Sequence, residues 1–176
     1  IEMASGVITD TVANAYEGIS DATTLNFSIM SSTIELSTLD GNTGFRLDGV
    51  ASGDRSGFSV SNAGDVNGDG FDDMIVGAWY ADSDVSNVGS SYVVFGKASH
   101  DSGTFSLSTL DGSNGFRLDG EASEYSGRSV SGAGDVNGDG FDDLVVGSYF
   151  ADPNGSASGS SYVVFGKASH DTGTFN

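Results

Sequence analysis

Two identical acidic stretches carry the residue types and spacing that could bind a metal ion. Asp65–Asp73 reads Asp-Val-Asn-Gly-Asp-Gly-Phe-Asp-Asp, and the same letters recur at Asp135–Asp143. Side-chain oxygens at positions 1, 3, 5 and 9, with the carbonyl oxygen of position 7, can curl around one point. Hard oxygen ligands in this number are typical of Ca²⁺. The predicted ligands are Asp65, Asn67, Asp69, Phe71 and Asp73 in the first stretch, and Asp135, Asn137, Asp139, Phe141 and Asp143 in the second.

The charge of each stretch also favours a cation. Asp72 and Asp142 add a further acid to each, and so many neighbouring carboxylates repel one another unless they are neutralised or protonated. A polar hairpin turn is the alternative, because Asn-Gly and Asp-Gly are strong turn signals. A helix-loop-helix calcium hand is not expected, because its acidic position 12 is occupied by Val76 or Val146.

The stretches belong to an internal repeat of about 70 residues. Ser90–Asp101 also recurs letter for letter, at Ser160–Asp171. The predicted organisation is a leader over residues 1–32, a first repeat over 33–103, and a second repeat with the start of a further unit over 104–176. The leader does not match the repeat, and its residues leave a linker, a cap and a pairing arm equally open.

Each repeat contains four short runs rich in β-branched and aromatic residues, bounded by Gly, Asp, Asn and Ser. The runs either side of each acidic loop predict an antiparallel hairpin. Met74–Val76 and Tyr92–Phe95 are continuous apolar runs, which indicates burial on both faces. The predicted fold is all-β, with two four-stranded antiparallel blades of the β-propeller type. The runs are Gly44–Asp48, Phe58–Gly64, Asp73–Trp79 and Ser91–Phe95, then Gly115–Asp119, Ser129–Gly134, Asp143–Tyr149 and Ser161–Phe165.

Composition excludes several functions. The chain has 176 residues, with 25 acidic against 6 basic and a net charge of −19, so binding to nucleic acid or to anionic membranes is not expected. It has no cysteine for a disulfide, thiolate metal site or thiol nucleophile, and no apolar run long enough for membrane insertion. Only two histidines occur, in consecutive Ser-His-Asp runs whose side chains cannot converge as a catalytic triad. We therefore expect no enzyme activity.

From about Thr33 to Phe175 the chain resembles the FG-GAP repeats of integrin α-subunit propellers and their bacterial relatives. Gly57-Phe58 and Gly77-Ala78 flank the first acidic loop as in that family, whereas Trp79 and Tyr149 stand where the family often has Pro. The second copy also departs from the pattern, with Gly127-Arg128 and with Ser148 in place of Ala. The resemblance implies four-stranded blades with Ca²⁺ in the hairpin loop. It also implies a secreted or cell-surface protein of structural or adhesive function.

Two blades cannot close a propeller, which generally has 4–8. The terminal Gly173–Asn176 matches Gly103–Ser106, the opening of another unit. The expected partners are therefore further repeats of the same chain or other copies of it, in the second case as the subunit of a self-assembling surface filament. A cell-surface protein or glycan could be a further partner. The alternative function is part of a longer β-propeller that binds glycans or carries an enzyme activity.

Overall fold

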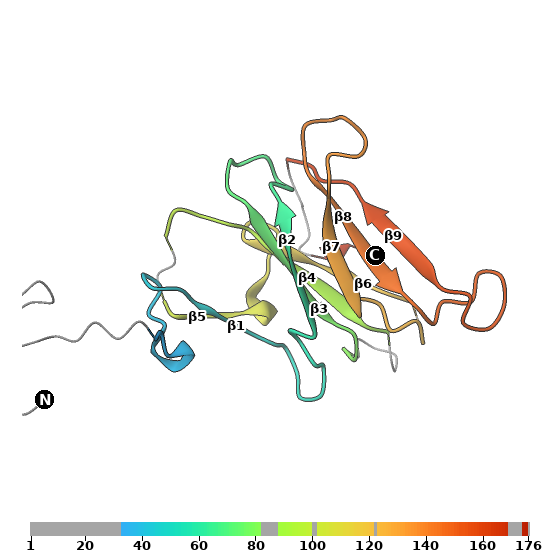
Figure 1. Cartoon of the computed structure of the whole chain (residues 1–176), viewed down its shortest axis with the longest axis horizontal. Helices are drawn as coiled ribbons and strands as arrows, with labels where there is room; N and C mark the ends of the chain where they lie inside the picture. The colour runs from blue at the N-terminus through green and yellow to red at the C-terminus, as the bar shows by residue number, and fades with distance from the viewer. Residues whose placement is uncertain (1–32, 82–87, 100–101, 122, 169–173, 176) are drawn as a thin grey trace, which may run out of the picture. The chain divides into compact units, whose positions relative to one another are not determined.

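In the described part of the chain, ten short strands form three sheets, and two short 3-10 turns lie outside them. Figure 1 shows how the elements follow one another along the chain. From Glu35 onwards the chain forms one compact unit. The predicted leader, residues 1–32, lies outside the described residues. The computed structural model of the chain describes residues 33–81, 88–99, 102–121, 123–168 and 174–175.

The predicted hairpins are present in both repeats. Strand β2 (Ser59–Gly64) pairs antiparallel with β3 (Asp73–Ala78), with an irregularity in register between Asn62 and Gly64 where the acidic loop begins. In the second repeat β7 (Ser129–Gly134) pairs in the same way with β8 (Asp143–Ser148). The next strand of each repeat, β4 (Ser90–Val94) or β9 (Ser160–Val164), extends its hairpin antiparallel.

The first sheet departs from the predicted arrangement, because its fourth strand comes from the second repeat. Its order is β10-β6-β4-β3-β2, with β6 (Gly115–Asp119) antiparallel to β4 and β10 (Thr174–Phe175) parallel to β6. The run Gly44–Asp48 was expected to be the first strand of its own blade. Only Arg46–Asp48 is a strand, β1, and it pairs parallel with β5 (Thr104–Ser106) instead.

The second sheet has three strands, β7-β8-β9, among the described residues. Two predicted four-stranded blades are therefore replaced by sheets of five and three strands and a separate β1-β5 pair. The two parallel pairs match each other, because β5 lies against β1 as β10 lies against β6. The 3-10 turns η1 (Leu36–Thr38) and η2 (Leu107–Thr109) also occupy corresponding places in the two repeats.

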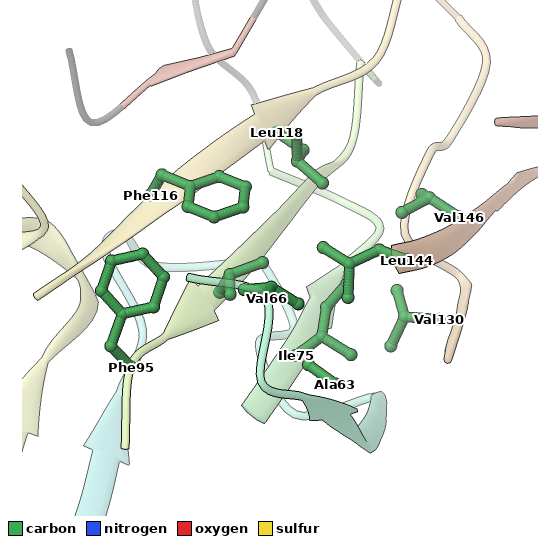
Figure 2. Packing of buried hydrophobic residues seen from close by; sticks show 10 residues of the cluster. Ala63, Val66, Ile75, Phe95, Phe116, Leu118, Val130, Leu144 and Val146 are labelled. Atoms are coloured by element: carbon green, nitrogen blue, oxygen red, sulfur yellow. The ribbon is translucent and has the colours of Figure 1, made fainter. Parts of the chain in front are cut away.

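Strands β3 and β4 of the first sheet are buried on both faces, as their continuous apolar runs predicted, whereas Val60 of the edge strand β2 is exposed. On one face Ile75 packs against Val130 and Leu144 of the second sheet (Figure 2). Val93 belongs to the same buried cluster. Along each strand the next residue points the opposite way. Val76 and Val94 accordingly pack on the other face, in a cluster with Leu107 of η2, against which Leu47 of β1 and Phe105 of β5 lie. The second sheet stacks on only one of these faces.

The helical content of the described residues is confined to the two short 3-10 turns. None of these has the length and apolar character that crossing a membrane requires.

Candidate metal site

The side chain of Asp65 lies at the centre of the first acidic loop. Its Oδ1 accepts hydrogen bonds from the backbone N–H groups of Gly68 and Asp69, at 2.8 and 3.0 Å, and its Oδ2 accepts one from Gly70 at 2.9 Å. Gly68 and Gly70 have φ of 77° and 89°, a region that suits glycine. The loop therefore winds tightly around the first predicted ligand.

The predicted ligands at positions 3 and 5 are joined to each other. Asn67 donates from Nδ2 to Oδ2 of Asp69 at 2.8 Å, and its Oδ1 accepts the N–H of Asp69 at 2.9 Å. Oδ1 of Asp69 in turn accepts the N–H of Phe71 at 2.9 Å. The loop of the second repeat has the same bonds around Asp135, Asn137 and Asp139. Identical sequence thus gives the same local structure twice.

Asp73, at position 9, lies at the base of the loop and is 1% exposed. Its two carboxylate oxygens accept the N–H groups of Val66 and Gly96, at 3.0 and 2.8 Å. Asp73 therefore ties the start of the loop to the end of β4, and Asp143 makes the corresponding bonds in the second repeat. Sequence reasoning assigned these residues as metal ligands and did not foresee this structural role.

The loop carboxylates are close enough to influence one another. The pKa of Asp73 is raised to about 6, chiefly by burial and to a smaller extent by the charges of Asp69 and Asp65, against the two backbone hydrogen bonds, which lower it. The carbonyl of Phe71 and that of Phe141 are the fifth predicted ligands of their loops. In the described part of the chain, no three His, Asp or Glu side chains converge as a ready metal cluster. The predicted ligands of each loop are carboxylate, amide and carbonyl oxygens. Oxygens of these kinds are the hard ligands that Ca²⁺ prefers.

Asp142 connects the two loops. It was recognised in the sequence only as an extra acid. Its Oδ2 accepts the N–H of Asp65 at 2.9 Å, and its own N–H donates to the carbonyl of Asp65 at 3.1 Å. Lys167 N–H also donates to the carbonyl of Val66 at 2.9 Å. The second loop therefore lies on the first, and the recurrence of an acid at position 8 was the available signal.

Rings and arginines gather where the two repeats meet, near the ends of β3 and β8. Trp79 contacts Phe58, at 5.5 Å between ring centroids, and Tyr125 of the second repeat, at 5.7 Å. The guanidinium groups of Arg55 and Arg128 each lie 5.0 Å from the Trp79 ring. Such cation–π contacts are favourable when desolvated. Trp79 therefore packs between the repeats.

The described fold and loops define an all-β repeat protein whose hairpins carry duplicated acidic loops. The model of the FG-GAP repeat matches residues 56–94 and 126–164, which cover β2 to β4 and β7 to β9. The chain therefore contains two FG-GAP repeats.

The chain is also similar in sequence to an integrin α-subunit. The chain is 35% identical to mouse integrin alpha-E over 99 residues, which are 53% of this chain and 8% of the integrin. The similarity thus concerns a small part of that longer protein.

Proposed function

We propose that the chain is a calcium-binding extracellular repeat protein with a structural or adhesive role and no enzyme activity. The two FG-GAP repeats and the similarity to an integrin α-subunit support an extracellular β-repeat protein. The observation that carries calcium binding is the duplicated loop, in which Asp65, Asn67 and Asp69 are held within one tight turn. Neither Asp65–Asp73 nor Asp135–Asp143 contains a basic residue that could neutralise the loop carboxylates.

Asp65, Asn67, Asp69 and the carbonyl of Phe71 would hold the ion, with Asp73 at the base of the loop. The second site would use Asp135, Asn137, Asp139, Phe141 and Asp143. Bound Ca²⁺ supplies positive charge to a set of carboxylates that otherwise repel one another. An ion that binds the folded loop better than the unfolded chain adds about 2.7 kcal/mol per site at a hundredfold excess over its Kd.

The test compares charge-removing variants of equal shape. We expect calcium to raise the Tm of the wild-type chain and excess chelator to lower it. Asp69→Asn with Asp139→Asn should abolish most of the calcium-dependent shift and weaken binding in calorimetric titration. Glu121→Gln removes an exposed charge outside the loops and is the control. An equal Tm in calcium and in chelator would contradict calcium binding.

Glycan binding is a second candidate, and one observation favours it. Tyr149 and Phe150 are 39% and 45% exposed, with the guanidinium of Arg128 4.5 Å from the Tyr149 ring. Exposed rings beside hydrogen-bond donors can stack on sugars. Binding on a glycan array that is lost in Tyr149→Ala would support this candidate, and an empty array would leave the structural role.

A further inference from the structure

Residues that are buried in the contact between the two repeats have exposed counterparts in the other repeat. We propose that the exposed side of the second sheet binds the exposed side of the first sheet of a second copy, head to tail, and that this contact repeats the one inside the chain. The inference rests on the proposed structural role and names its partner, a second copy of this chain. Association of copies is measured separately from calcium binding.

Burial identifies the two surfaces. Within the chain, β7 packs on the first sheet and Val130 is 8% exposed, whereas Val60, its counterpart in β2, is 66% exposed. On the other side of the contact, Val93 is fully buried and its counterpart Val163 in β9 is 51% exposed. At each of these two positions, the valine of one repeat is therefore buried and the corresponding valine of the other repeat is exposed. We call the two uncovered sides the Val60 surface and the Val163 surface.

Further pairs fall into the same two groups. Val66 and Phe95 are buried by the second repeat, while their counterparts Val136 and Phe165 on the Val163 surface are 57% and 52% exposed. Isolated exposed apolar residues are normal, but a contiguous set marks a binding surface. Because each exposed residue has a buried twin in the other repeat, the buried twin shows what covers it.

The strand edges are complementary as well. β6 pairs with β4, where Ser90 lies opposite Asp119 and its Oγ donates to that carboxylate at 2.7 Å. β9 has the sequence of β4, and its outer edge has no partner among the described strands. Gly44–Asp48 has the sequence of β6, and the β1 edge opposite β5 is likewise unpaired there. Unpaired edges accept strands from other chains, so β1 of one copy fits β9 of another, with Ser160 opposite Asp48.

Hollows in the Val163 surface match protrusions of the Val60 surface. The space that a side chain at Gly68 would occupy is filled by Phe141 of the second repeat, at 2.5 Å, whereas nothing lies within 4 Å of the corresponding point at Gly138. Phe71, the counterpart of Phe141, is 43% exposed. Asp72, the counterpart of Asp142, is also exposed. Phe71 of one copy can therefore cover Gly138 of another.

Each surface also contains a pocket. One lies over β8 and β9 and is lined by Gly147, Ser160 and Ser161 among others. In the first sheet the corresponding residues are covered by the loop before β7, whose Gly127 closely approaches the Ser90 carbonyl and Ser91 Oγ. The second pocket lies between Leu47 and the exposed Val60. The place that corresponds to each pocket is thus filled by the other repeat inside the chain.

The two surfaces lie on different sheets and differ from each other, so the contact is heterologous. Heterologous contacts produce a closed ring if the rotation between copies closes and an open polymer if it does not. A contact between like surfaces would instead stop at a dimer. This difference gives the proposal a specific test.

The experiment blocks one surface at a time. Val60→Asp places a charge on one surface and Val163→Asp on the other, and both positions are exposed in the single chain, so folding should persist. We expect wild-type chains to associate and each variant alone to have the mass of one chain by light scattering. An equimolar mixture should have the mass of two chains, because one surface of each kind remains. Val50→Asp is the control, since Val50 is 42% exposed and its counterpart Glu121 stays exposed beside the internal contact.

A second measurement fixes the register and does not depend on the charge variants. The chain has no cysteine, so Ser160→Cys and Asp48→Cys, made in separate chains, should form a disulfide between copies when mixed under oxidising conditions. Cross-linking of Ser160→Cys with Val50→Cys should be much weaker. A wild-type chain that stays monomeric at all concentrations, or variants that still associate, would overturn the proposal. Association that persists in chelator would support the contact between copies, even if the chain proved not to bind calcium.

Discussion

Asp142 shows how one carboxylate can hold two repeats together. It accepts the N–H of Asp65 and lies in the contact between the loops, while Asp72, the same residue in the first repeat, is exposed. The sequence around the two residues is identical. Their difference is therefore caused by position in the array and not by local structure.

Asp142→Ala should destabilise the chain by about 1–3 kcal/mol, because the partly buried N–H of Asp65 loses its acceptor. Asp72→Ala is the matched control and should change the free energy of unfolding by less than about 0.5 kcal/mol. Urea unfolding of dilute protein measures both. Equal effects of the two variants would argue against the role of Asp142 in joining the loops.

At the scale of elements, the hairpins and their loops could be predicted, whereas the strand partners could not. Runs of β-branched and aromatic residues and the Asp-rich turn are local signals, and they placed β2, β3, β7 and β8 nearly to the residue. The pairing of β6 with β4 joins strands of different repeats. Because Gly44–Asp48 and Gly115–Asp119 are identical, no local signal indicates which sheet each one joins.

The same limit applies to the candidate site. The spacing of Asp65, Asn67 and Asp69 predicted residues that the structure brings together in one loop. It could not reveal that both oxygens of Asp73 accept buried backbone N–H groups, because Gly96 lies on a distant strand end. A local sequence pattern can predict the loop. The hydrogen-bond partners of each carboxylate oxygen depend on contacts between residues that are distant in sequence.

Phe95 and Phe165 allow a prediction about the packing of β4 and β9. Phe95 is buried, with its ring centroid 5.9 Å from that of Phe116. Phe95→Ala should lower the free energy of unfolding by about 3–5 kcal/mol through the cavity and the lost burial. Phe165→Ala should have a much smaller effect on dilute protein, since this ring is half exposed. Chemical denaturation of both variants measures the difference, and similar losses would contradict the packing described.

At the scale of the whole molecule, two apolar surfaces are uncovered, the Val60 surface of the first sheet and the Val163 surface of the second. Both belong to a chain with a net charge of −19, and like charge opposes non-specific association. Specific packing must therefore outweigh this repulsion for copies to associate.

Association should make stability depend on concentration. A partner that binds only the folded chain stabilises it by mass action, so the Tm of the wild-type chain should rise with protein concentration and with added salt, which screens the repulsion. Val60→Asp should show a Tm independent of concentration. Scanning calorimetry over a dilution series makes the comparison, and a constant Tm for the wild type would argue against association.

The boundary between the two sequence repeats does not coincide with the boundary between the sheets. The first sheet takes β6 from the second repeat, so the two boundaries differ by one strand. An in-frame duplication of about 70 codons therefore adds one complete sheet wherever the crossover falls, since each new unit gives a strand to its predecessor and receives one from its successor. A self-contained domain would be broken by most such crossovers. This architecture can thus gain or lose units by unequal recombination while every internal contact is preserved.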